Sequence, residues 1–150
     1  MVKISDPRKR GKYSNAACGK YFPMHPEKYK GKTVPIFKSN LERKTMLYLD
    51  KSANVIQWSY EPKAINYFDK ASNKVRRYFV DFTAVIKAGP LQKTVWIEVK
   101  CESEANPPKN KKNIKACMTW LTNCCKWEAA KKLAKSKGCE FHILTEKQLG

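Results

Sequence analysis

Alternating apolar and polar positions mark a pair of strands in the middle of the chain. In residues 94–100 the alternation places Glu98 and Lys100 on the same face of an extended segment. The segment before it, roughly 77–86, is rich in aromatic and β-branched residues and predicts another strand. Residues 88–90, Ala-Gly-Pro, are a turn signal between the two segments. The pattern therefore predicts an antiparallel hairpin.

Two shorter strands are expected before this hairpin. Residues 54–60 alternate and end at Glu61-Pro62, where the proline cannot continue the ladder of a central strand. Residues 64–68 predict another strand, and 69–73 form a polar turn after it. Because strands that follow each other in sequence commonly pair, we expect an antiparallel meander.

Helix signals lie on both sides of these strands. Ser39 and Glu42 have the spacing of a capping box, which predicts a helix that begins at Ser39 and continues through Leu49. A proline-containing loop follows Lys100, and a second helix of about 109–137 is expected after it. Its apolar positions at helical spacing predict a buried stripe of Ile114, Met118, Leu121, Cys125, Ala129 and Leu133.

The C-terminal segment predicts three short features in succession. Gly138 is the expected stop of the long helix, because glycine readily adopts the left-handed conformation at a helix C-terminus. Residues 140–144 predict a final strand. Thr145 and Gln148 have capping-box spacing and predict a short terminal helical turn.

This order of elements predicts a mixed α/β or α+β fold with a sheet flanked by helices. Residues 1–38 are rich in Lys, Arg, Gly and Pro and predict an irregular basic arm, part of it ordered. We expect residues 39–150 to form one domain that keeps its fold without the arm. No glycine-rich nucleotide-binding loop or serine nucleophile elbow occurs, so those enzyme classes have no support.

The charge of the chain points to nucleic acid. With 31 Lys and Arg against 13 Asp and Glu, the formal net charge is +18. Such an excess suits a phosphate backbone and promotes association with it. A membrane surface would also attract this charge, but there is no apolar run of spanning length and no long basic amphipathic helix with an exposed apolar face.

Two clusters of basic residues are candidate phosphate contacts. The first lies in the arm and comprises Arg8, Lys9, Arg10 and Lys12. The second lies at the start of the long helix and comprises Lys111, Lys112 and Lys115. A solvated helix face is the alternative for the second cluster, although few acidic residues are available to pair with these lysines.

The central hairpin carries candidate catalytic chemistry. Antiparallel pairing can bring Asp81 beside Glu98, and two adjacent carboxylates repel each other unless a cation lies between them. Oxygen ligands suit magnesium or manganese. Lys100 beside them could polarise a water molecule or hold an oxyanion. The alternative is a surface hairpin with solvated charges. Glu42 likewise has a capping role available without any catalysis.

A helical glutamate, an aspartate at the end of an aromatic strand and Glu-x-Lys in the next strand resemble the PD-(D/E)XK nuclease superfamily. The motifs around Ser39–Arg43, Val55–Pro62, Arg77–Phe82, Ile97–Lys100 and Leu144–Glu146 are similar to those of TnsA-type nuclease domains. With its size and basic arm, the chain most resembles the head completion nucleases of myovirus-type tailed phages. Val80 replaces the proline of the superfamily name, at a position that supplies no ligand.

The resemblance implies a restriction-endonuclease-like mixed central sheet and a role for each motif residue. Asp81, Glu98 and the carbonyl of Val99 would bind Mg²⁺, for which Mn²⁺ can substitute. Lys100 would orient or activate the attacking water, and Glu42 would lie at the edge of the site. The implied reaction is endonucleolytic hydrolysis of double-stranded DNA, with exonuclease action as an addition.

The same resemblance implies a place in virus assembly. The protein would act in phage head completion and head–tail joining, with capsid, portal or neck proteins as partners. It would work in the host cytoplasm during assembly and could be retained in the virion. Two other hypotheses for the function stay open. The protein could be a basic DNA-binding or virion structural protein without required catalysis, or a nuclease for transposon ends or DNA junctions.

Overall fold

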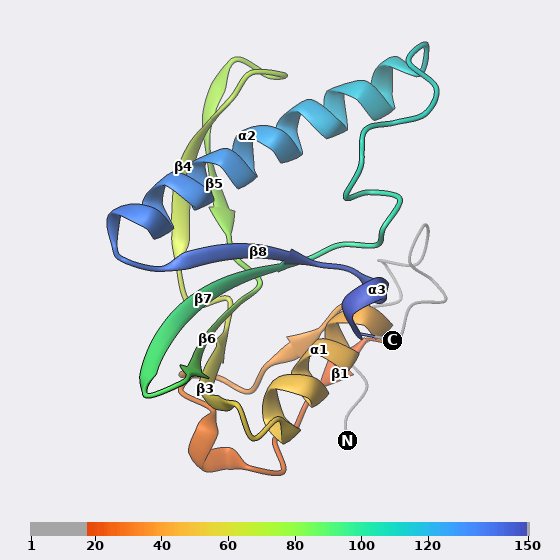
Figure 1. The fold of residues 1–150 in the computed structure, drawn as a ribbon. Coiled ribbons are helices and arrows are strands. Elements are labelled where there is room, and N and C mark those ends of the chain that lie inside the picture. Colours follow the sequence, from red (N-terminus) through yellow and green to blue (C-terminus); the bar gives the residue numbers. More distant parts are fainter. Residues whose placement is uncertain (1–17, 150) are drawn as a thin grey trace.

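A four-stranded mixed sheet forms the centre of the computed structural model, which describes residues 18–149. Its strands lie in the order β3 (Val55–Tyr60), β6 (Phe82–Ala88), β7 (Leu91–Val99) and β8 (Glu140–Leu144). The first three pair antiparallel, whereas β7 and β8 are parallel. Helices lie on both sides of this sheet (Figure 1). The predicted mixed sheet flanked by helices is confirmed.

Each face of the sheet is covered by a different helix. Helix α1 (Asn40–Lys51) contributes Met46 to a core that includes Val95 and Ile97 of β7. Trp96 lies in a second core with Ala130 and Ala134 of the long helix α2. Alternate side chains of β7 therefore belong to two cores, one on each face of the sheet. Together the two cores bury the C-terminal end of the strand almost completely.

The chain before Asp81 differs from the expected meander. Strands β4 (Ala64–Asp69) and β5 (Lys74–Phe79) form a separate two-stranded hairpin, and β3 pairs with β6 instead of with β4. The predicted strand 77–86 is thus wrong, because the chain leaves one sheet at Phe79, bends at Asp81 and enters the other at Phe82. This bend places Asp81 at a junction between two sheets.

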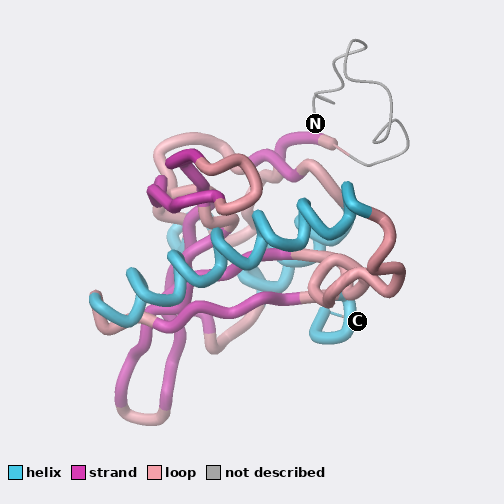
Figure 2. The backbone as a smooth tube through the Cα atoms, turned by 90° about the horizontal axis from the view of Figure 1, so that it is seen from above, coloured by secondary structure: helices cyan, strands magenta, loops and turns pink. Residues whose placement is uncertain are grey.

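Helix α2 (Ile114–Ser136) runs along the face of the sheet and reaches the β4–β5 hairpin (Figure 2). It starts later than predicted, because the side chain of Asn113 accepts a hydrogen bond from the amide of Ala116 and caps it. The predicted buried stripe is only partly right: Cys125, Ala129 and Leu133 are half-buried against the second core, whereas Ile114 and Met118 are exposed. The fully buried residues of α2 are Asn123, Trp127, Ala130 and Ala134, none of which was predicted.

The C-terminal predictions are confirmed. Gly138 has φ +72° and follows the end of α2, where its amide donates to the carbonyl of Lys135. Strand β8 has the predicted bounds, and α3 (Glu146–Leu149) begins at the second capping box. There the amide of Thr145 donates to the side chain of Gln148 at 2.7 Å. None of the helices in residues 18–149 has the length and hydropathy to span a membrane.

The described part of the predicted arm packs against the domain. Strands β1 (Gly19–Lys20) and β2 (Ile36–Phe37) pair antiparallel, with the 3-10 helix η2 (Pro26–Lys28) between them. Phe37 is 2% exposed and belongs to the core under α1. Because this packing ties the described part of the segment to the domain, we now expect removal of residues 1–38 to destabilise the fold. The division of the chain at residue 38 remains a prediction.

Asp50, on α1, holds this N-terminal segment in place. It is fully buried, and its carboxylate accepts hydrogen bonds from the hydroxyl of Tyr21 at 2.6 Å and from the amides of Met24 at 2.7 Å and His25 at 3.0 Å. Burial alone raises the pKa of Asp50, but these hydrogen bonds outweigh it, so the net pKa is lowered. The ammonium of Lys28 donates to the backbone carbonyl of Asp50 at 2.7 Å.

We expect Asp50→Ala to lower the free energy of unfolding by about 3 kcal/mol at neutral pH, because it leaves buried donors without an acceptor. Asp50→Asn keeps one acceptor oxygen and should lower the free energy of unfolding by less than Asp50→Ala. Since the folded pKa is lowered, the contribution of Asp50 is present above the ordinary carboxyl pKa and is lost as the pH falls through the folded pKa. Urea unfolding of both variants at neutral pH and at about pH 3 checks this. An equal loss at both pH values would contradict it.

Candidate active site

Asp81 and Glu98 face each other at the end of the β6–β7 ladder. Phe82 pairs with Ile97, so the next position along each strand sets Asp81 opposite Glu98. The hairpin turn that fixes this register consists of the two residues between Ala88 and Leu91, and its first residue, a glycine, has φ +62°. The structure therefore brings together the two carboxylates that the sequence pattern paired.

Each carboxylate is held by one hydrogen bond from the protein. The Oδ2 atom of Asp81 accepts from the amide of Val99 at 2.8 Å. The Oε2 atom of Glu98, a residue that is 6% exposed, accepts a short hydrogen bond from the hydroxyl of Tyr78. Within residues 18–149 no hydrogen bond involves the other oxygen of either carboxylate. One oxygen of each is therefore fixed and the other is available to a ligand.

The electrostatics of this pair are unfavourable without a cation. Burial, followed by the nearby charge of Glu98, raises the pKa of Asp81 well above its usual value. Burial also raises the pKa of Glu98, although the Tyr78 hydrogen bond and the positive charges of Lys100 and Lys126 oppose the rise. Two buried carboxylates that resist ionisation together are the electrostatic environment that a divalent cation relieves.

The donors present fit a hard cation. In residues 18–149 no three His, Cys, Asp or Glu side chains gather as a metal site. A cation here would thus be held by the free oxygens of Asp81 and Glu98 together with a backbone oxygen. In an extended strand the amide and carbonyl of one residue point to the same side, so the Val99 carbonyl faces the Asp81 side of β7. An all-oxygen set of this kind suits Mg²⁺ or Mn²⁺.

Glu42 lies at the N-terminus of α1 and within the electrostatic range of the pair. Its amide donates to the hydroxyl of Ser39 at 3.1 Å, as the capping signal predicts, but its carboxylate accepts from the amide of Lys38 at 2.6 Å instead of from Ser39. Burial raises the pKa of Glu42, and its own charge raises the pKa values of Asp81 and Glu98. Capping and a position beside the carboxylates therefore coexist.

Lys100 follows β7 directly and is half-buried. Its positive charge lowers the pKa values of three carboxyl groups, those of Glu42, Asp81 and Glu98. Among the described residues its ammonium forms no ion pair. A cation close to three acids but paired with none is free to hold a water molecule or a phosphate oxygen.

Two residues beside Glu98 were not anticipated from the sequence. Tyr78 lies in β5, and its ring also has the ammonium of Lys126 over it, 5.7 Å from the ring centre. Lys126 lies on α2 three residues after Asn123 and four before Ala130, which places it at the edge of the buried face of this helix. A correct prediction of the buried face of α2 would have placed Lys126 near Glu98.

The structure places only part of the predicted DNA-binding set. Arg8, Lys9, Arg10 and Lys12 lie outside the described residues. The remaining three lysines are all exposed: Lys111 and Lys112 lie in the loop before α2, and Lys115 lies in its first turn. Their exposure leaves them available to a phosphate backbone. Their role in DNA binding remains a prediction.

The sequence also matches a known family. The model described as TnsA-like endonuclease N terminal matches residues 52–146, more than half of the chain. The chain belongs to this TnsA-like endonuclease family. It is also 35% identical over 141 residues to the "Head completion nuclease" of Enterobacteria phage T4, an alignment that covers 87% of this chain and 92% of that protein.

Membership confirms the nuclease that the resemblance to TnsA-type domains implied. The TnsA-like match begins after Glu42 and includes Asp81, Glu98 and Lys100. It also includes the turn after Lys100 and all of α2. The elements that build the paired carboxylates are therefore elements of the TnsA-like domain itself.

Proposed function

We propose that this TnsA-like protein is a magnesium-dependent DNA endonuclease that hydrolyses phosphodiester bonds. The observation that carries the proposal is the carboxylate pair of Glu98, which is buried, and Asp81, which is partly buried, each with one oxygen fixed by the protein and one free. A structural DNA-binding protein has no physical need for such a pair, because buried like charges destabilise a fold. A hydrolase that binds a divalent cation does have that need.

The residues of the site would have distinct roles. Asp81, Glu98 and the carbonyl of Val99 would hold Mg²⁺, which stabilises negative charge on the phosphate and on the leaving oxygen when it is bound. Tyr78 and the Val99 amide keep the two carboxylates in position. Lys100 orients the attacking water and takes up developing charge, and Glu42 lies at the edge, where it can hold a water molecule through its carboxylate.

The net charge supports DNA as the substrate. A charge of +18 attracts a polyanion irrespective of its sequence, and exposed lysines before and on α2 lie at the end of the loop that follows Lys100. Arg8, Lys9, Arg10 and Lys12 would add phosphate contacts from the N-terminal segment. We infer that DNA reaches the carboxylates along this basic surface.

The biological setting we propose is the completion of phage heads. The support is the 35% identity to the phage T4 "Head completion nuclease" over nearly the whole of both chains. In this setting the protein would act in the host cytoplasm during assembly, at head–tail joining, and would be retained in the virion. Capsid, portal or neck proteins would be its partners.

A plasmid assay tests the activity and its metal requirement. Purified protein is incubated with supercoiled DNA and with end-labelled linear duplex, in Mg²⁺, in Mn²⁺ and in EDTA. We expect nicking in either metal and a return to background in EDTA, because the carboxylates alone would repel the phosphate. The linear substrate separates internal cleavage from loss of terminal nucleotides. Cleavage that persists in EDTA, or DNA that is bound but never cut in any metal, would refute the proposal.

A further inference from the structure

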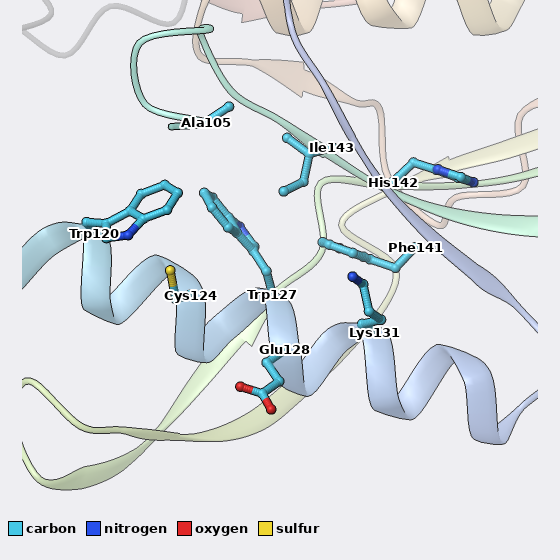
Figure 3. A pocket seen from close by; sticks show the side chains of 9 residues that line it. All are labelled: Ala105, Trp120, Cys124, Trp127, Glu128, Lys131, Phe141, His142 and Ile143. Carbon is cyan, nitrogen blue, oxygen red and sulfur yellow. The ribbon is translucent and has the colours of Figure 1, made fainter. Parts of the chain in front are cut away.

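An aromatic pocket lies between α2 and β8, outside the group of carboxylates. Its volume is about 440 Å³, within the range of ligand-binding pockets. Figure 3 shows side chains of α2 facing those of β8, with the loop after Lys100 closing one end. The residues that carry the argument are Trp120, Trp127, Lys131, Phe141 and Ile143.

The pocket is adjacent to the proposed catalytic residues. In the parallel β7–β8 ladder Ile143 pairs with Glu98, and Phe141 pairs with Trp96. Paired residues of neighbouring strands point to the same face, and the strands are about 5 Å apart. Phe141 and Ile143 therefore lie on the same face of the sheet as Glu98, one strand away. A nucleotide next to the phosphate at Glu98 would lie within reach of the pocket.

The chemistry of the lining suits a nucleobase. Trp120 and Trp127 stand edge to face, with ring centres 5.7 Å apart, and Phe141 faces them from β8 (Figure 3). Such rings provide flat surfaces on which any base can stack. The Nε1 group of Trp127 is buried, and no described residue accepts its hydrogen bond. Trp127 is 8% exposed, so the partly exposed Trp120 is the ring of this pair that offers a surface to a base.

The pocket is lined by one charge of each sign, Lys131 and Glu128, and the carboxylate of Glu128 is paired with the ammonium of Lys132 at 3.8 Å. Lys131 projects from α2 beside Phe141 (Figure 3), where its ammonium can meet a phosphate while the base lies against the rings. An apolar side chain of a protein partner would also fill the space. The net charge of +18 and the position beside Glu98 favour a nucleotide over such a side chain.

We propose that this pocket binds an unpaired base of the DNA strand whose neighbouring phosphate lies at Asp81 and Glu98. The inference rests on the proposed function, and it names the substrate class more closely: DNA with an unpaired or frayed nucleotide beside the cleavage position. A base that is already unpaired costs less to place in a pocket than one taken from a duplex. Ends and junctions are therefore preferred over intact double helix.

The test measures DNA binding in EDTA, so that it does not depend on cleavage. One duplex is blunt, and two others carry a three-nucleotide 5′ or 3′ overhang that contains 2-aminopurine. We expect one overhang duplex to bind about tenfold more tightly than the blunt one, because a base gains an aromatic stacking partner. The fluorescence of 2-aminopurine should fall on binding. Trp120→Ala should abolish the preference and the quenching and leave the affinity for blunt duplex unchanged.

Two further variants complete the design. Tyr48→Ala removes an exposed aromatic ring from α1, on the other side of the sheet, and should keep the preference. Lys131→Ala changes an exposed side chain with little effect on the fold and should weaken only the overhang complex, about threefold. Equal affinity for all three duplexes, or a preference that Trp120→Ala retains, would overturn the pocket proposal. Failure of metal-dependent cleavage with the preference intact would overturn the nuclease proposal alone.

Discussion

Glu98→Gln is expected to reduce DNA cleavage at least about a thousandfold in saturating Mg²⁺, which corresponds to about 4 kcal/mol in the activation free energy. The substitution keeps the volume of the side chain and an oxygen that can accept the hydrogen bond from Tyr78. It removes only the charge, and with it an anionic ligand for the cation. The measurement is the initial rate of plasmid nicking over a range of Mg²⁺ concentrations.

A loss of folding would not explain this result, because the structure predicts the opposite effect on stability. Burial raises the pKa of both Glu98 and Asp81, so their ionised forms destabilise the metal-free fold at neutral pH. A folded pKa above the unfolded value costs stability as the pH rises towards and through the folded pKa. Glu98→Gln should therefore melt at the same temperature as the wild type or higher in EDTA.

Two controls make the cleavage result specific. Glu27→Gln removes the same charge from an exposed residue of η2, far along the chain from the carboxylate pair, and should cleave at the wild-type rate. Added Mg²⁺ should raise the melting temperature of the wild type and of Glu27→Gln, and should do so much less for Glu98→Gln. If Glu98→Gln cleaves DNA within tenfold of the wild-type rate, Glu98 is not a ligand of the catalytic metal.

The centre of the site could be predicted from sequence because local rules determine it. The two-residue turn at Gly89 fixes the register of β6 and β7, and that register sets Asp81 opposite Glu98. Because successive side chains of a strand point to opposite faces of the sheet, Glu98 and Val99 lie on opposite faces of β7. Capping signals likewise placed Glu42 at a helix N-terminus.

The surroundings of the site depend on tertiary packing and were predicted less well. No local signal tells that the chain changes sheets between Phe79 and Phe82, since both sides of the bend have strand composition. In α2, Ile114 and Met118 satisfy helical spacing but are exposed, whereas the polar Asn123 is buried. Apolar spacing alone cannot distinguish a face that meets a partner element from one that does not.

The two features that were predicted wrongly, the bend before Asp81 and the buried face of α2, position the residues around the carboxylates. The bend brings Tyr78, at the end of β5, within hydrogen-bonding distance of Glu98. The face of α2 that packs against the sheet places Trp127 in the aromatic pocket. Lys126, at the edge of this face, lies over the ring of Tyr78. The hairpin and helix that sequence reasoning placed least well are therefore the ones that position and surround the carboxylates.

Two truncations are expected to have sharply different effects. Removal of residues 1–38 takes away Phe37, whose loss from a core typically costs about 3–5 kcal/mol by itself, and all the side-chain and amide donors to Asp50. Because domains of this size are stable by only about 5–15 kcal/mol, we expect this variant to be largely unfolded. Removal of residues 1–17 leaves those contacts in place, and we expect its melting temperature to change little. Circular dichroism melts compare the two variants.

The shorter truncation isolates the contribution of the basic N-terminal segment to DNA binding. It removes the four predicted phosphate contacts, Arg8, Lys9, Arg10 and Lys12. Each contact contributes about 0.9 to the slope of log affinity against log salt concentration, so the slope should become shallower by about 3 to 4 and affinity should fall about a hundredfold at physiological salt. Alanine substitution of the same four residues in the full chain is the matched control. An unchanged salt slope in both variants would place phosphate recognition on the lysines around α2 instead.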